Sequence, residues 1–152
     1  VYLRFGRLAV PRFNDPDTYK FEIGKGIELA EGSDVTIVAT GLMVNEAMIA
    51  KDMLKEEGIS ARVINIHTIK PLDEELVVKA AQATGRVFTV EEHSIIGGLG
   101  SAVMECLAEK NPVKVTRIGV RDTFGESGPA KDLLHKYELD AEGIYKQIKA
   151  AL

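Results

Sequence analysis

The chain has 152 residues, of which 45% are apolar and 28% are charged, a composition typical of one globular domain with its own core. The net charge of −4 comes from interspersed acidic and basic residues, which excludes a dominant nucleic-acid-binding or membrane-binding surface. The single cysteine, Cys106, excludes an internal disulfide and is typical of a reducing compartment. No apolar run approaches membrane-spanning length, so we expect a cytoplasmic protein.

The first residues resemble the end of a preceding unit. The chain begins with Val1 rather than methionine, and residues 1–5 have the pattern of an extended strand. The turn-rich run at 14–17, Asn-Asp-Pro-Asp, is typical of a linker. We therefore expect that residues 1–15 are the end of a preceding domain and a linker, that something has been removed upstream, and that the domain itself spans 16–152.

The predicted elements follow in chain order. Alternating apolar residues at 21–29 predict a short strand pair or an irregular edge. Four strands are predicted at 35–40, 61–67, 86–92 and 113–120, and helical stripes at 43–54, 76–84, 102–107, 130–137 and 141–148. Gly58 and Gly85 end the first two helices, and Asp140 is the expected N-cap of the last. This alternation predicts an α/β fold, a parallel sheet with right-handed crossovers and helices on both faces.

A ligand site in such a sheet lies beyond the carboxyl ends of the strands. The loops there carry polar side chains or glycine at ten positions: Thr40, Gly41, His67, Lys70, Glu91, Glu92, His93, Arg121, Asp122 and Glu126. Acid–base chemistry is conceivable with this set, but the favoured interpretation makes the two histidines structural or interface residues. Elsewhere, His135 is expected to face solvent, and Cys106 to be a buried, inert thiol.

The glycine-rich turn at 97–100, "GGLG", raises the question of a bound phosphate. A helix start can hold an anion, which makes Gly97 and Gly98 candidates, but the dinucleotide fingerprint is incomplete. Glycines also allow tight turns and close packing. The sequence has no "GxxxxGK[ST]" loop, no "GxSxG" elbow and no metal-ligand spacing.

Five segments, in order, resemble the C-terminal domain of the transketolase family: "YLRFGRLAVP", "SDVTIVATG", "INIHTIKPLD", "VEEHSIIGGLGSAV" and "FGESGPAKDLLHKYELDAEGI". The resemblance covers essentially the whole chain and is greatest to the separate C-terminal subunit of two-chain transketolases. It implies a three-layer α/β/α domain with a five-stranded mixed sheet, mostly parallel. The one antiparallel strand is then expected in "KFEIGKGIELA".

The resemblance implies a function that this chain does not perform alone. Transketolases transfer a two-carbon ketol group between sugar phosphates of the pentose phosphate pathway, using thiamine diphosphate and a divalent metal. The "GDG…N" motif that holds this cofactor is absent here, as is the domain that carries the activating glutamate. We expect an inactive fragment that binds no cofactor itself and serves as the partner of an N-terminal domain or subunit, in a homodimer of the full assembly.

Two arginines are the implied substrate-binding residues. Arg7 matches the arginine that contacts the substrate phosphate in transketolases, and Arg4 matches an extra arginine of the 1-deoxyxylulose-5-phosphate synthases. Guanidinium groups suit this task because their donors form a fixed fork and keep their charge. The competing interpretation leaves both arginines solvated.

The resemblance also implies that the loop at 91–100 serves packing between domains, with Glu91 and His93 in polar contacts. Glu138 departs from the family, which usually has glycine there, so the boundary between the last two helices is uncertain.

Three alternatives remain open. One is a regulatory or anion-binding module that uses His67, Glu91, His93 and Arg121 at the sheet rim. The others are the corresponding domains of 1-deoxyxylulose-5-phosphate synthase and of a 2-oxoacid dehydrogenase beta subunit. The last is disfavoured, because its substrates carry no phosphate for Arg7 to hold.

Overall fold

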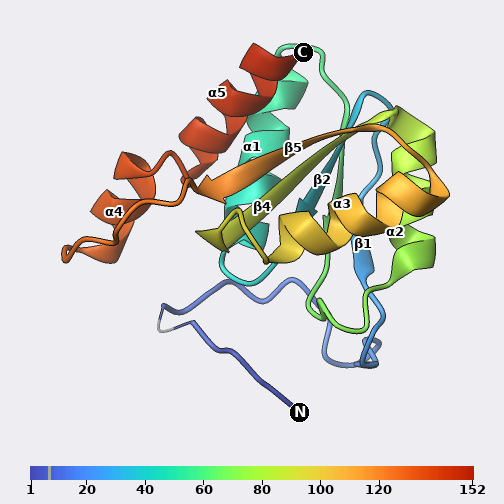
Figure 1. The fold of residues 1–152 in the computed structure, drawn as a ribbon, viewed down its shortest axis with the longest axis horizontal. Helices are drawn as coiled ribbons and strands as arrows, with labels where there is room; N and C mark the ends of the chain where they lie inside the picture. Colours follow the sequence, from blue (N-terminus) through green and yellow to red (C-terminus); the bar gives the residue numbers. More distant parts are fainter. Residues whose placement is uncertain (7) are drawn as a thin grey trace.

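The structure, a computed structural model, describes residues 1–6 and 8–152. It contains the strands β1 (Ile27–Ala30), β2 (Val35–Ala39), β3 (Ala61–Asn65), β4 (Arg86–Ser94) and β5 (Lys114–Val120). The helices are α1 (Met43–Glu56), α2 (Glu74–Thr84), α3 (Leu99–Lys110), α4 (Ala130–Lys136) and α5 (Ala141–Ala151). Figure 1 shows the strands at the centre of the molecule, with helices on either side.

The five strands form one mixed sheet in the order β1-β3-β2-β4-β5. Only β1 runs antiparallel, beside β3, and the other neighbours are parallel. Ile37 at the centre of β2 lies opposite Val63 of β3 and Phe88 of β4. The predicted mixed sheet, with its antiparallel strand in the "KFEIGKGIELA" region, is confirmed.

One prediction near the amino terminus is wrong, and another is decided between its two alternatives. Residues 1–5 form no strand, and their side chains are exposed, because no strand of the described chain pairs with them. Of the two alternatives for 21–29, the irregular edge is confirmed and the strand pair is not: one four-residue strand, β1, lies at the edge of the sheet with a shifted register. Phe21 and Ile23 lie outside it with more than half of their surface exposed. Apolar alternation predicts a strand only where a pairing partner is in reach.

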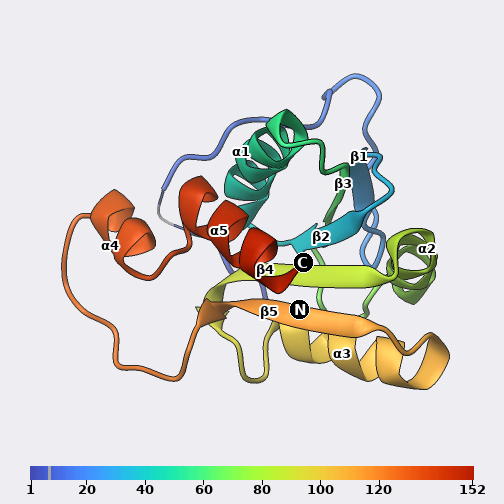
Figure 2. The same ribbon diagram turned by 90° about the horizontal axis from the view of Figure 1, so that it is seen from above.

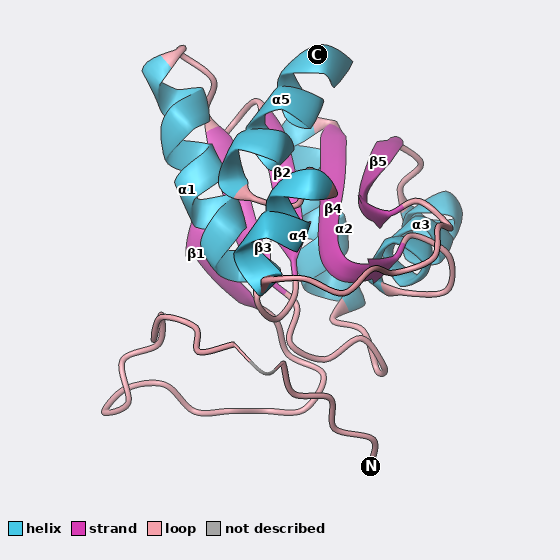
Figure 3. Ribbon diagram, turned by 90° about the vertical axis from the view of Figure 1, so that its left-hand side faces the viewer, coloured by secondary structure: helices cyan, strands magenta, loops and turns pink. Residues whose placement is uncertain are grey.

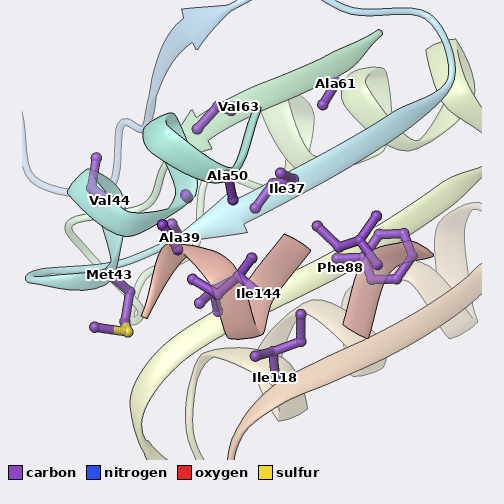
Figure 4. Close-up of a cluster of buried hydrophobic side chains, with 14 of the residues drawn as sticks. Ile37, Ala39, Met43, Val44, Ala50, Ala61, Val63, Phe88, Ile118 and Ile144 are labelled. Atoms are coloured by element: carbon purple, nitrogen blue, oxygen red, sulfur yellow. The ribbon is translucent and has the colours of Figure 1, made fainter. Parts of the chain in front are cut away.

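The sheet separates two apolar clusters, which makes the domain three layers thick. One cluster joins the sheet face of Ile37, Phe88 and Ile118 to helices α1 and α5 through Ala50 and Ile144. Figure 4 shows these side chains converging between the strands and the helices. The other cluster joins the opposite face to α2 and α3, and Figures 2 and 3 show the two helical layers on opposite sides. The predicted three-layer α/β/α architecture is confirmed.

Local signals set the helix ends. Asp140 accepts a hydrogen bond from the Gly143 amide at 2.8 Å and caps α5, as predicted. Gly58 and Gly85 adopt φ values of +80° and +67° directly after α1 and α2, the left-handed conformation that terminates helices.

Glu138, where the resembled family usually has glycine, lies at the junction between α4 and α5. Glu138 has a φ of +55°, so a non-glycine residue occupies a left-handed position. The amide of Leu139 bonds the Leu134 carbonyl at 2.8 Å, and the amide of Glu138 bonds the His135 carbonyl at 3.0 Å. These two bonds are the Schellman pattern of a helix end, and they end α4 in spite of the unfavourable residue.

The amino-terminal segment runs along the edge of the sheet where the parallel strands end, as Figure 3 shows, while the carboxyl terminus lies at the opposite edge. In the described chain, three hydrogen bonds connect this segment to the end of β4 and to the loop after β3: Arg4 to the Glu92 carbonyl, Tyr19 to His67, and the Gly26 amide to Asp73. The default ligand edge of the fold is thus partly covered by the chain itself. In the described part of the chain, no helix combines the length and the apolar character needed to cross a bilayer.

Candidate functional site

The polar residues predicted at the carboxyl ends of the strands do lie along one edge of the sheet, but each has its own partner. Glu91 and His93 belong to the end of β4, His67 follows β3, and Arg121 follows β5. The rim is therefore a row of separate contacts, and the geometry of each decides what it can do.

Glu91 is the most unusual of these residues because its carboxylate is buried, with 2% of the residue exposed. Its Oε2 accepts a hydrogen bond from the Leu99 amide at 2.7 Å, and its Oε1 accepts one from the Gly100 amide at 2.8 Å. These amides belong to the first turn of α3, where donors lack partners and the helix dipole favours negative charge. The glycine-rich turn therefore holds an anion, and that anion is a side chain of the same protein.

The glycines beside this contact allow the close approach that it requires. A Cβ on Gly98 would lie 1.9 Å from Oε2 of Glu91, and one on Gly100 would lie 2.7 Å from Cγ of Arg117 and 2.8 Å from Oγ1 of Thr89. Both glycines allow close approach, but the neighbours are side chains of this chain rather than the backbone that we expected; packing of the loop between domains stays a prediction. Gly97 has a different role, since it turns the chain at a φ of +76° and its amide donates to Oγ of Ser101.

His67 is enclosed by the amino-terminal segment. Its Nε2 lies 3.4 Å from the Tyr19 hydroxyl, and its Nδ1 lies 2.8 Å from Oγ1 of Thr68. The Phe21 ring lies 4.8 Å away, between centroids, at a tilt of 38°. Both ring nitrogens have neighbours within the chain, so the geometry is that of a structural histidine.

His93 and Arg121 are exposed and separate from Glu91. His93 contacts the Ser94 carbonyl through Nδ1 at 2.9 Å, and Arg121 donates to the side-chain oxygen of Gln147 at 3.4 Å. No described contact joins either of them to His67 or Glu91, so the structure does not assemble these four residues into one pocket.

Of the two candidate arginines, the structure describes only Arg4. Arg4 is exposed, and its Nη2 donates to the Glu92 carbonyl at 3.3 Å, which places its guanidinium at the edge where the strands end. Arg7 lies outside the described residues. Its role in holding a substrate phosphate stays a prediction.

Within residues 1–6 and 8–152, no three histidine, cysteine or acidic side chains are grouped as metal ligands would be. Cys106 is 6% exposed in the α2–α3 cluster, and burial raises the pKa of its thiol, with the carboxylate of Glu74 adding to the effect. The predicted burial of Cys106 is confirmed, and the raised pKa is consistent with low reactivity, because a thiol that resists ionisation is a poor nucleophile.

Sequence reasoning missed the internal capping by Glu91, which it treated only as a polar contact. The available signal was an acidic residue at a strand end, eight positions before the first helical residue of a glycine-rich turn. It also missed Phe124, which is 99% exposed and whose neighbours Arg121–Pro129 gave no pattern of helix or strand.

Taken together, the fold and the site define a three-layer α/β/α domain whose glycine-rich turn is closed by its own carboxylate. Residues 24–144 match the family model described as "Transketolase, C-terminal domain". The chain belongs to this family.

Similar proteins are consistent with that assignment. The chain is 49% identical over 146 residues to the 6-deoxy-6-sulfo-D-fructose transketolase subunit SqwH of Clostridium sp. (strain MSTE9), with 96% of the chain and 45% of that protein covered. It is 48% identical to an apulose-4-phosphate transketolase subunit of Phocaeicola vulgatus, covering 96% of the chain and 46% of the relative. The chain thus spans about half the length of these relatives.

A solved structure described as "Split gene transketolase, inactive beta4 tetramer" superposes with a TM-score of 0.90 at 51% identity, covering 96% of this chain and 48% of that one. A larger protein also contains a similar segment. The 1-deoxy-D-xylulose-5-phosphate synthase of Syntrophotalea carbinolica is 45% identical over 136 residues, which are 88% of this chain and 22% of that enzyme.

Proposed function

We propose that this chain is the C-terminal part of a transketolase and acts in transfer of a two-carbon ketol group between sugar phosphates. The observation that carries the proposal is the similarity to transketolase subunits along 96% of the chain. Since the chain spans less than half of those relatives, the catalytic assembly includes further domains. The boundary of the family domain at residue 16 and a cytoplasmic location in the pentose phosphate pathway belong to the same proposal.

The cofactor fits poorly on the described residues. A diphosphate needs free donors and positive charge, but the amides of Leu99 and Gly100 already bind Glu91, whose negative charge repels a phosphate. Thiamine diphosphate and its divalent metal are therefore assigned to the N-terminal partner, and this chain alone is inactive. The complete enzyme is a dimer of such assemblies, with the active site completed by both parts.

Substrates with an acidic group at one end are the proposed class. The two relatives are named for a sulfonated and a phosphorylated sugar, and both groups are oxyanions. Arg7 is the proposed contact to that group, with Arg4 nearby in sequence as a weaker second. Binding energy from such a remote group positions the reacting carbonyl.

The test is reconstitution with the N-terminal partner, assayed for ketol transfer. Arg7→Ala should raise KM for phosphorylated sugars about 10- to 100-fold, because a charge-assisted hydrogen bond is worth about 1.5–3 kcal/mol. Unphosphorylated sugars should be almost unaffected, and Arg4→Ala should have a smaller effect. Arg12→Ala, at an exposed arginine in the same segment, is the matched control. Equal losses for both kinds of sugar would contradict the phosphate role, and an inactive reconstituted pair would contradict the transketolase assignment.

A second candidate is supported by the 45% identity to a 1-deoxy-D-xylulose-5-phosphate synthase. Formation of 1-deoxy-D-xylulose 5-phosphate by the reconstituted pair, in place of ketol transfer between sugar phosphates, would favour this candidate.

Self-association belongs to the proposal as well. The solved relative with 51% identity is described as a beta4 tetramer, and this supports assembly of our chain with copies of itself.

A further inference from the structure

An arm projects from the body between β5 and α4. Residues 121–129 are all exposed, and Figure 2 shows the segment and α4 extending away from the sheet. The arm nevertheless has a defined shape. Lys136 donates to both carboxylate oxygens of Glu126, at 2.7 and 2.6 Å, and the Tyr137 hydroxyl donates to the Phe124 carbonyl at 3.3 Å. These bonds connect the arm to α4 and Tyr137, while Phe124 is 99% exposed.

The strand that leads into the arm is an open edge of the sheet. In the described chain, β4 is the only strand paired with β5, so the outer edge of β5 offers unpaired amides and carbonyls. The other edge strand, β1, is four residues long, and this shortness discourages pairing with another chain. The register is irregular at both edges, between β1 and β3 and between β4 and β5. Strand β5 carries Lys114 and Arg117, but it is seven residues long and contains no proline, so it is the longer template for an added strand.

A small apolar groove lies at the beginning of β5. It has a volume of about 220 Å³ and is lined by Met104, Leu107, Ala108, Pro112, Val113 and Val115. Ligand pockets occupy about 300–1,000 Å³, so this groove is small for a metabolite. Its size and apolar lining suit one aromatic side chain.

We propose that the outer edge of β5, the arm and this groove form one surface that binds a second copy of the chain. Two β5 strands paired antiparallel about a two-fold axis place the end of one beside the beginning of the other. The arm that follows Val120 in one copy then lies next to the groove at Pro112 and Val113 of its partner, and Phe124 enters that groove. The contact is reciprocal, as a two-fold interface requires, and the described beta4 assembly of the similar structure supports a second copy as the occupant.

This inference rests on the self-association included in the proposed function, and its first test is the oligomeric state of the purified chain by sedimentation equilibrium. The wild type should form dimers or larger even-numbered species. Phe124→Asp should raise the dissociation constant at least about tenfold, because buried aromatic anchors dominate interface energy. Ile49→Asp, at an exposed apolar residue of α1, is the matched control and should associate like the wild type.

A second test keeps Phe124 in place. The pair Thr123→Cys and Met104→Cys should yield covalent dimers on mild oxidation, since the arm of one copy lies at the groove of the other. The control pair, Thr123→Cys and Ile49→Cys, should yield far less.

A monomeric wild type, an assembly that Phe124→Asp leaves unchanged, or equal cross-linking by both pairs would each overturn the inference. If the chain is monomeric and Phe124→Asp instead weakens binding of the N-terminal partner, the arm belongs to that interface. Catalysis by the reconstituted pair is measured separately, so the test of the transketolase assignment does not depend on the result for the interface.

Discussion

At the scale of single residues, we expect substitution of Glu91 to change the free energy of unfolding most. Its carboxylate satisfies two buried amides of α3, and an unpaired buried donor costs about 1–3 kcal/mol. Glu91→Ala should therefore lower the free energy of unfolding by about 2–4 kcal/mol. Glu91→Gln should lose nearly as much, because its amide group cannot accept the second bond.

Urea denaturation followed by circular dichroism measures this loss. The control is Glu92→Ala, which removes an exposed neighbour and should change stability by less than about 0.5 kcal/mol. Equal stabilities for the two variants would contradict the capping role of Glu91.

Glu138 provides a prediction of opposite sign. A φ of +55° costs a residue with a Cβ about 1–2 kcal/mol of backbone strain in the folded state. Glycine removes this strain, but the greater conformational entropy of its unfolded chain offsets about 0.5–1 kcal/mol of the gain. Glu138→Gly should thus stabilise the protein by about 0.5–1 kcal/mol.

The midpoint of thermal unfolding is a sufficient measurement. Glu105→Gly, at an exposed position inside α3, should instead cost about 1 kcal/mol. Destabilisation by both glycines would show that Glu138 makes contacts that outweigh its backbone strain.

At the scale of elements, the junction of α4 and α5 should respond to pH. His135 of α4 lies 2.7 Å from Oδ2 of Asp140, the cap of α5. The hydrogen bond that His135 donates to Asp140, together with the negative charge of Asp140, raises the pKa of His135 above its ordinary value of 6.5. Partial burial acts to raise the pKa of Asp140, but the bonds from His135 and the Gly143 amide outweigh it and lower that pKa below 3.8.

The sign follows from these directions. A raised histidine pKa stabilises the fold fully below about 6.5, and this contribution is lost as the pH rises through the folded pKa. The Asp140 contribution is present above its unfolded value of 3.8 and is lost at lower pH. His135→Gln should therefore destabilise the protein more at pH 5.5 than at pH 8.5, as measured by urea denaturation at both pH values. His93→Gln, at an exposed histidine that contacts only a carbonyl, is the control, and an identical pH response in both variants would contradict the pairing.

Elements were predictable where the signal is local. The stripe through Ala47, Ala50 and Leu54, together with Gly58, predicts α1 and its end because both depend on neighbours along the chain. The four-residue β1 was not predictable in its length, because Phe21 and Ile23 extend the apolar alternation without reaching a partner strand. Glu91 could be placed at a strand end, but its contact with α3 depends on the three-dimensional turn between them.

At the scale of the whole molecule, the resemblance to the family predicted the layers and the antiparallel strand, and both are confirmed. The path of the amino-terminal segment was not predictable, because it depends on contacts far apart in sequence, such as Arg4 with Glu92 and Tyr19 with His67. That segment places Arg4, one of the two proposed substrate-binding arginines, at the edge where α/β domains usually bind ligands. The segment contacts His67 through Tyr19, whereas Glu91 is bound by the α3 amides and His93 and Arg121 are exposed, so these rim residues have separate surroundings.

The plugged turn at the start of α3 has a consequence for anion binding. A phosphate-binding loop and this loop differ in the source of the negative charge. A bound ligand supplies it in the first, and the side-chain carboxylate of Glu91 supplies it in the second. Loss of the acid at position 91 would leave the amides of Leu99 and Gly100 without this internal partner.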